Sequence, residues 1–182
     1  MILAKSAFRF CSLFLALMVL ASAPVLAGGL SLGTAAVKIT PPIGIPLAGY
    51  YSPRGSEGVL DDLYTKVVVL DDGQTQVAMV VCDLITVPRH TVLEARKLIE
   101  QQTKIPGSRV MISATHTHTG PVLARETARD DSDGGSGDLA NKYTAELPAK
   151  IAQGVAEASG RLVPVRTSFA HGHEDRMAFT RR

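Results

Sequence analysis

Two histidines, His116 and His118, stand one residue apart in the segment SATHTHTG, residues 113–120, directly after a short apolar run. In an extended strand, residues i and i+2 point to the same face, so both imidazoles would meet at one place. Neutral imidazole is a common zinc ligand, and a catalytic zinc binds three protein ligands and keeps one open position. The pair therefore indicates a metal or catalytic site. A polar strand end whose histidines hydrogen-bond to nearby loops explains the same spacing.

Other sites that use this spacing fit the chain less well. A metallo-β-lactamase-like site needs Asp-His after the pair, whereas Gly120 and Pro121 follow here. Amidohydrolase barrels carry the pair at the end of their first strand, whereas several predicted strands precede it in this chain. A second pair, His171 and His173, could join the first in a four-imidazole site, but exposed histidines at a strand end are ordinary. His90 is expected at the surface of a helix.

Apolar periodicity predicts the elements that position these side chains. An Asp-Gly step at residues 72–73 between two β-branched runs predicts a hairpin. A helix is expected to open at Thr86, with Pro88 in its first turn, and a second one should contain Tyr143, Leu147, Ile151 and Val155, with Pro148 kinking it or starting its main part. The predicted strands cover residues 34–39, 64–70, 77–84, 110–114 and 166–169. This order predicts an α/β fold, a mixed sheet with helices packed on it.

Two loops and one acidic residue carry further hypotheses. Residues 43–58 are rich in Gly, Pro and Tyr, so Tyr50, Tyr51 and Arg54 either border a substrate groove or pack within their own loop. Asp83 either orients a histidine by accepting a hydrogen bond from its ring or caps the following helix. The run DDSDGGSGD at residues 130–138 lacks the residue order of a calcium-binding loop, so a solvated surface loop is expected.

Residues 1–27 have the pattern of a secretory signal peptide, with two early basic residues, an apolar stretch and small residues before the expected cleavage site. Export to the periplasm or the exterior follows from this interpretation. Removing the segment leaves 17 of the 19 Lys and Arg against 17 Asp and Glu, so no electrostatic argument favours a nucleic-acid partner. Cys82 is then the one remaining cysteine and is expected in a strand core.

Beyond the histidine pair, several blocks of the chain resemble the N-terminal part of the neutral/alkaline ceramidase family. The blocks appear in the family's order over roughly residues 34–182, and the first and fifth together are quite specific. They are AVKITPP at 36–42, PLAGY at 46–50, VLDDG at 69–73, VVCDL at 80–84, ATHTHTGP at 114–121 and AFTRR at 178–182.

This resemblance implies a zinc-dependent hydrolase that cleaves the N-acyl amide of ceramide to sphingosine and a fatty acid. It implies that His116 binds Zn²⁺, while His118 and Arg181 stabilise the oxyanion of the tetrahedral intermediate. Thr180 departs from the asparagine that usually precedes the family's arginine. The implied partner is a ceramide-like lipid, with contact to a membrane surface, and no specific protein partner is inferred.

The family's catalytic set extends beyond these matches. It includes a second zinc histidine, a glutamate, a tyrosine and a serine nucleophile, all of which the family's order places after Arg182. The expectation is that residues 28–182 form an incomplete N-terminal portion of a ceramidase-like catalytic domain, inactive by itself. The alternative is a non-catalytic exported domain that binds a metal or a lipid.

Overall fold

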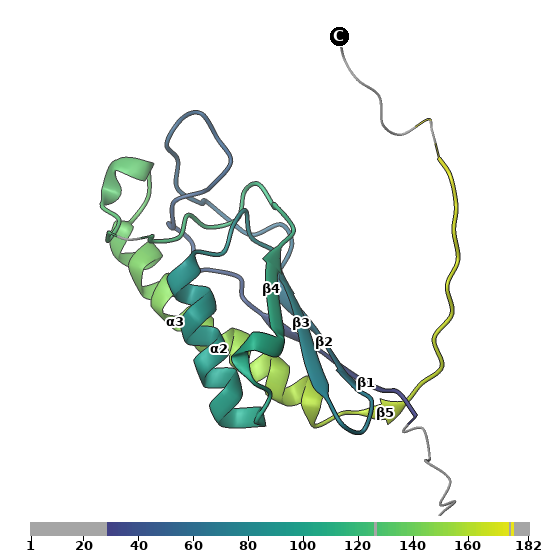
Figure 1. The fold of residues 1–182 in the computed structure, drawn as a ribbon. Helices are drawn as coiled ribbons and strands as arrows, with labels where there is room; N and C mark the ends of the chain where they lie inside the picture. The colour runs from purple at the N-terminus through teal and green to yellow at the C-terminus, as the bar shows by residue number, and fades with distance from the viewer. Residues whose placement is uncertain (1–28, 126, 175, 177–182) are drawn as a thin grey trace, which may run out of the picture.

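The computed structural model describes residues 29–125, 127–174 and 176. The expected signal peptide and Arg181 lie outside the described residues. Within them the chain forms one mixed five-stranded sheet in the order β4-β3-β2-β1-β5 (Figure 1). Neighbouring strands are antiparallel except β3 and β4, which are parallel. The strands are β1 Ser31–Lys38, β2 Tyr64–Asp71, β3 Gln76–Cys82, β4 Val110–Ala114 and β5 Val163–Pro164. The predicted mixed sheet is thereby confirmed.

Two helices, α2 Arg89–Thr103 and α3 Gly137–Ser159, lie side by side on one face of the sheet (Figure 1). Helix α2 links the parallel strands β3 and β4, as parallel pairs require a crossover connection. Short 3₁₀ turns, η1 Gly107–Arg109 and η2 Asp131–Asp133, precede β4 and α3. The helices and the facing side of the sheet enclose one apolar core. None of the helices in the described residues is long and apolar enough to cross a membrane.

The hairpin between β2 and β3 forms for the local reason that the sequence indicates. Gly73 has φ 86°, in the left-handed region that glycine adopts without a steric penalty. One carboxylate oxygen of Asp72 accepts the N–H groups of Gln74 and Thr75 at 2.9 and 2.7 Å. The turn therefore supplies its own hydrogen bonds, and the two strands leave it in antiparallel register.

Helix α3 supplies the largest single contribution to the core. Leu147, Ile151 and Val155 recur every four residues and are fully buried, as the spacing predicts. Pro148 lies inside the continuous helix and is also buried, so it neither ends nor starts it. Gly154 permits close approach to the sheet, because a Cβ there would lie 3.0 Å from Cγ2 of Val67.

Several boundary predictions were wrong. The first strand is Ser31–Lys38 rather than residues 34–39, and the first helix begins at Arg89, with Pro88 at the N-cap, rather than at Thr86. The third strand ends at Cys82 rather than at residue 84, and residues 166–169 form no strand. The last strand is instead Val163–Pro164, which pairs with the start of β1. A two-residue strand on the sheet edge carries no alternating pattern, so periodicity could not locate it.

The buried thiol of Cys82 should make stability fall at alkaline pH. Burial raises the pKa of Cys82 above its ordinary value of 9.0, and Sγ lies 3.5 Å from Oγ1 of Thr65. The unfolded chain loses the thiol proton first as the pH rises, so this contribution is complete below the unfolded pKa and is lost progressively as the pH rises from there through the higher folded pKa. Urea denaturation at about pH 8 and about pH 10 measures the loss. Cys82→Ala should reduce the pH dependence, whereas an equal dependence in both proteins would exclude the thiol as its source.

Candidate functional site

Three loops meet at one end of the sheet, where several strands finish. Strands β1 and β3 are both antiparallel to β2, and β4 is parallel to β3, so β1, β3 and β4 all end at the same edge. The segments that follow them, residues 39–63, 83–88 and 115–121, lie together at the top of Figure 1. In open α/β sheets, ligands bind outside the carboxyl ends of strands. The histidine pair lies in the third of these segments.

Backbone hydrogen bonds hold the histidine loop between the other two segments. The N–H of Thr117 donates to the carbonyl of Leu84 at 3.0 Å, on the side of β3. On the other side the N–H of Thr119 donates to Ala48 at 3.0 Å, and the N–H of Ala48 donates back to Gly120 at 2.8 Å. The loop is therefore fixed at both edges by segments distant in sequence.

The two histidines do not continue the strand, so the predicted alternation was the wrong geometry. β4 ends at Ala114, and His116 has φ 62° in the left-handed region, which non-glycine residues adopt at a cost. The rings nevertheless lie together, with centroids 5.2 Å apart and planes inclined by 67°. The loop's turn, rather than strand alternation, brings the two imidazoles to one place.

A backbone carbonyl orients the ring of His116. Its Nδ1 lies 3.2 Å from the carbonyl oxygen of Ile85. A carbonyl oxygen only accepts hydrogen bonds, so this contact assigns the proton to Nδ1. The lone pair is then on Nε2, which faces away from Ile85 and can bind a ligand. Metal-binding histidines commonly have this arrangement, in which the second ring nitrogen donates to a carbonyl. The side chain of His116 is exposed, so Nε2 is accessible.

Gly49 supports the ring of His118. This glycine has φ 90°, and a Cβ added to it would lie 2.4 Å from Nδ1 of His118. The imidazole therefore packs directly on the Gly49 backbone. Sequence reasoning did not identify Gly49 or Ile85 as supports. A glycine within the block PLAGY was the available signal for the first, whereas a backbone carbonyl leaves no signal in the sequence.

Clefts flank the histidine loop on two sides. One, of about 330 Å³, is bordered by Tyr50, Tyr51, Ile85 and Gly49, so it adjoins the supports of both rings. The two tyrosines line this cleft, and Arg54 does not. The other, of about 410 Å³, has walls contributed by Thr117, Thr119, Leu47, Val59, Leu60 and Leu63. It is mainly apolar and can accommodate a hydrocarbon chain.

Arg54 and Asp83 support the scaffold. The guanidinium of Arg54 lies 4.2 Å from the centre of the Tyr50 ring. One carboxylate oxygen of Asp83 accepts the N–H of Tyr64 at 3.1 Å and lies 3.4 Å from Nζ of Lys66. Asp83 therefore neither orients a histidine nor caps α2, which has no side-chain cap. Its position at the end of β3 places it within the sheet's own hydrogen-bond network.

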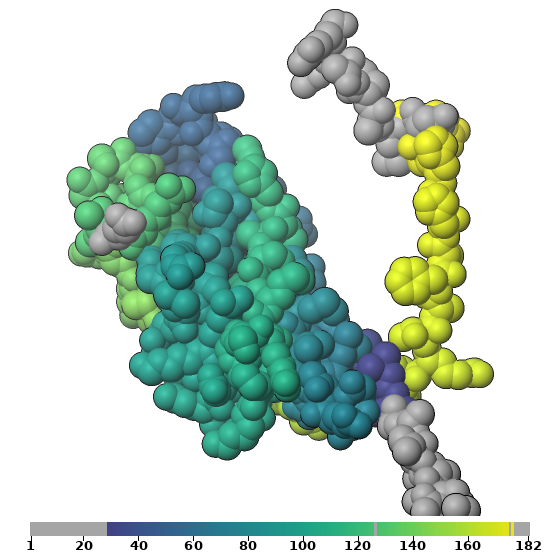
Figure 2. Space-filling model, in the orientation of Figure 1, coloured from purple at the N-terminus to yellow at the C-terminus, as the bar shows by residue number. Residues whose placement is uncertain are grey.

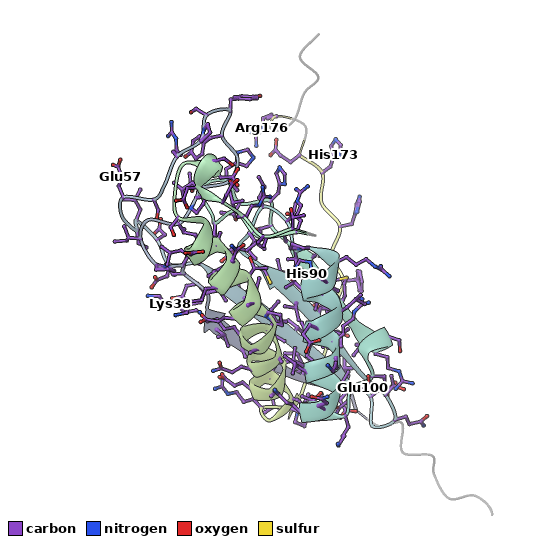
Figure 3. All side chains as sticks on the ribbon, turned by 90° about the vertical axis from the view of Figure 1, so that its left-hand side faces the viewer. Lys38, Glu57, His90, Glu100, His173 and Arg176 are labelled. Carbon is purple, nitrogen blue, oxygen red and sulfur yellow. The ribbon has the colours of Figure 1, made fainter. Side chains whose placement is uncertain are left out.

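The other predicted site residues are not brought to the pair. His171 and His173 lie on the extended segment after β5, which runs separately from the body of the molecule in Figure 2. His90 lies at the N-terminal end of α2 (Figure 3). Across residues 29–125, 127–174 and 176, no group of three or more His, Cys, Asp or Glu could hold a metal ion. The four-imidazole arrangement is therefore absent from the described part of the chain.

The fold and the histidine loop together define an α/β domain with a His-Thr-His turn at the carboxyl ends of its strands. Its fold matches the crystal structure of neutral ceramidase from Pseudomonas aeruginosa, with a TM-score of 0.62 and 23% identity. A structure of ceramidase complexed with C2 matches with a TM-score of 0.61 and 22% identity. Each match covers 75% of this chain and 22% of the other.

The resemblance to neutral ceramidase is thus confirmed at the level of fold. The chain spans about a fifth of the length of these two solved structures. No protein-family profile matches the sequence. No curated protein matches it either.

Proposed function

We propose that this chain carries part of the catalytic site of a zinc-dependent amide hydrolase of the neutral ceramidase type. The observation that carries the proposal is the His116 ring, turned by the Ile85 carbonyl so that Nε2 is available as a ligand. It lies in a fold that matches neutral ceramidase, in the block that the sequence resemblance assigns to zinc binding. The proposed reaction is cleavage of the N-acyl amide of ceramide to sphingosine and a fatty acid.

The described residues supply one zinc ligand rather than a complete ligand set. A catalytic zinc needs three protein ligands, and His116 is the one that the resemblance assigns within this chain. When bound, zinc would acidify or orient an attacking group. The described residues alone do not form that centre.

His118 and Arg181 are proposed as oxyanion-stabilising groups. Fixed donors directed at a developing oxyanion lower the barrier because they need no reorganisation during the reaction. The packing of His118 on Gly49 supports this role, since it holds the imidazole 5.2 Å from that of His116, measured between ring centres. Arg181 is proposed on the resemblance alone.

We also propose that the enzyme is exported and acts on a membrane lipid. The cleft beside Thr117 and Thr119 supports a substrate with a hydrocarbon chain, because Leu47, Val59, Leu60 and Leu63 give it aliphatic surface. Tyr51 and Leu60, both fully exposed, lie on the loop that borders the histidine site. These side chains support contact with a lipid surface.

The second candidate function is a non-catalytic exported domain that binds a metal or a lipid. The incomplete ligand set favours it, because a single histidine or a histidine pair binds zinc without creating a catalytic centre. The apolar cleft supports the lipid alternative. The two candidates differ in whether the histidine loop takes part in hydrolysis.

Zinc titration of the full chain, followed by nitrogen NMR of the imidazoles, tests the assignment of His116. We expect zinc to shift the Nε2 resonance of His116 while Nδ1 keeps its proton, because Nδ1 is held by Ile85. His116→Ala should weaken zinc binding, whereas the matched variant His90→Ala should not. Equal weakening by the two variants, or zinc bound at Nδ1 of His116, would exclude the proposed ligand.

A further inference from the structure

One face of the sheet has no helix packed on it. Helices α2 and α3 lie on the face that includes the buried side chains of Val67, Val69 and Val80 (Figure 1). The extended segment after β5 runs separately from the body of the molecule (Figure 2), so no element among the described residues covers the opposite face. On that face Met79 is 37% exposed and Met111 51%. We name it the open face.

Strand register makes the open face apolar across four strands. The pairing aligns Thr34, Val68, Met79 and Met111 in one row across β1, β2, β3 and β4. This row borders an open hollow of about 620 Å³. Further apolar side chains on the same face, by strand alternation, are Leu32, Ala36, Leu70, Val77 and Val81. The accessible side of the sheet is therefore aliphatic over most of its width.

The two central strands have the sequence of strands that are covered on both faces. Residues 67–70 and 77–82 are unbroken apolar runs. An antiparallel sheet with one solvated face alternates apolar and polar residues, whereas strands that are buried on both faces are continuously apolar. Strands β2 and β3 therefore indicate a second layer against the open face.

The charged groups beside the hollow are already paired. Lys66 and Arg161 are the charged residues that border it. Nζ of Lys66 lies 3.4 Å from a carboxylate oxygen of Asp83, and Nη2 of Arg161 lies 3.2 Å from one of Glu157. A partner selected by charge would need unpaired groups here. The open face instead suits a flat apolar surface without net charge.

The size of the open face fits a small protein–protein interface. Strands β1 and β2 have eight residues each, and β3 has seven. At about 3.3 Å per residue and about 4.8 Å between strands, β1–β4 present a flat area of about 400–500 Å². Because side chains project from this area, two such faces in contact remove about 1,000–1,500 Å² of surface from water, the range of a small specific interface. Monomeric soluble proteins rarely expose a contiguous apolar patch of this extent.

We propose that the open face is an interface between two copies of this chain. Two sheets stack about 10 Å apart with their strand directions within about 30° of each other. A two-fold pair then has four layers, helix, sheet, sheet and helix, and both open faces are covered. Such a pair needs a face that matches itself, which a flat apolar face with its charges already paired does. The interface does not depend on the proposed hydrolase function.

Sedimentation velocity of the purified protein, from about 1 µM to about 1 mM, tests this interface. We expect a reversible equilibrium between monomer and dimer. Met79→Lys should weaken dimerisation by more than about 10-fold, because it buries an unpaired charge in the middle of the face. Leu93→Lys is the matched control, since Leu93 is 49% exposed on α2, away from the open face, and should leave the dimerisation constant unchanged.

Thr34→Lys keeps the test decisive if Met79→Lys does not fold. Thr34 is exposed in the same row, so this replacement changes the open face without changing the core, and it should also weaken the dimer. A monomer at every concentration would overturn the proposal and leave the open face to a different polypeptide. Irregular aggregates without a defined dimer, or a dimer that neither lysine on the open face weakens, would overturn it as well.

Discussion

Replacing Gly49 by alanine is expected to displace the ring of His118 and to lower the free energy of unfolding by about 1–3 kcal/mol. Two physical effects combine at this position. The backbone has φ 90°, which alanine adopts only with strain, and the new Cβ would lie 2.4 Å from Nδ1 of His118. Urea denaturation measures the stability, and the imidazole NMR signals of His118 report the displacement.

Gly44→Ala separates the two effects. Gly44 has nearly the same φ, 92°, but a Cβ there would meet only Cδ1 of Leu139, at an ordinary 3.6 Å. The Gly44 variant should therefore lose stability through backbone strain while the His118 signals stay unchanged. If both variants perturb His118 equally, the ring does not depend on contact with Gly49.

Leu147→Ala should lower the free energy of unfolding by about 2–5 kcal/mol. Leu147 is fully buried in α3, whose apolar face covers the sheet, so truncation leaves a cavity that the surrounding side chains fill only in part. Leu93→Ala is the matched control, because Leu93 is 49% exposed on α2. Chemical denaturation should show a loss of less than about 1 kcal/mol for that control. Comparable losses in the two variants would contradict the position assigned to α3.

The elements that the sequence predicted well are those determined locally. Asp72 and Gly73 build their own turn, so the β2–β3 hairpin follows from a few neighbouring residues. The apolar positions of α3 follow the helical period, because one face of that helix packs on the sheet. The mixed sheet then follows from the order of the elements.

The geometry of the histidine loop could not be predicted in the same way. The left-handed backbone at His116 is stabilised by Thr117 bonding to Leu84 and Thr119 bonding to Ala48, which are contacts distant in sequence. Strand alternation therefore predicted that the two rings would meet, but for the wrong reason.

The most direct test of the central claim places this chain in a complete enzyme. The matching segment of the neutral ceramidase from Pseudomonas aeruginosa is replaced by its counterpart from this chain, and hydrolysis of a fluorescent short-chain ceramide is measured with zinc present. We predict that the chimaera hydrolyses the substrate, that His116→Ala in it removes measurable hydrolysis, and that His90→Ala does not. A folded chimaera without activity, or one in which His116→Ala leaves the rate unchanged, would contradict the account.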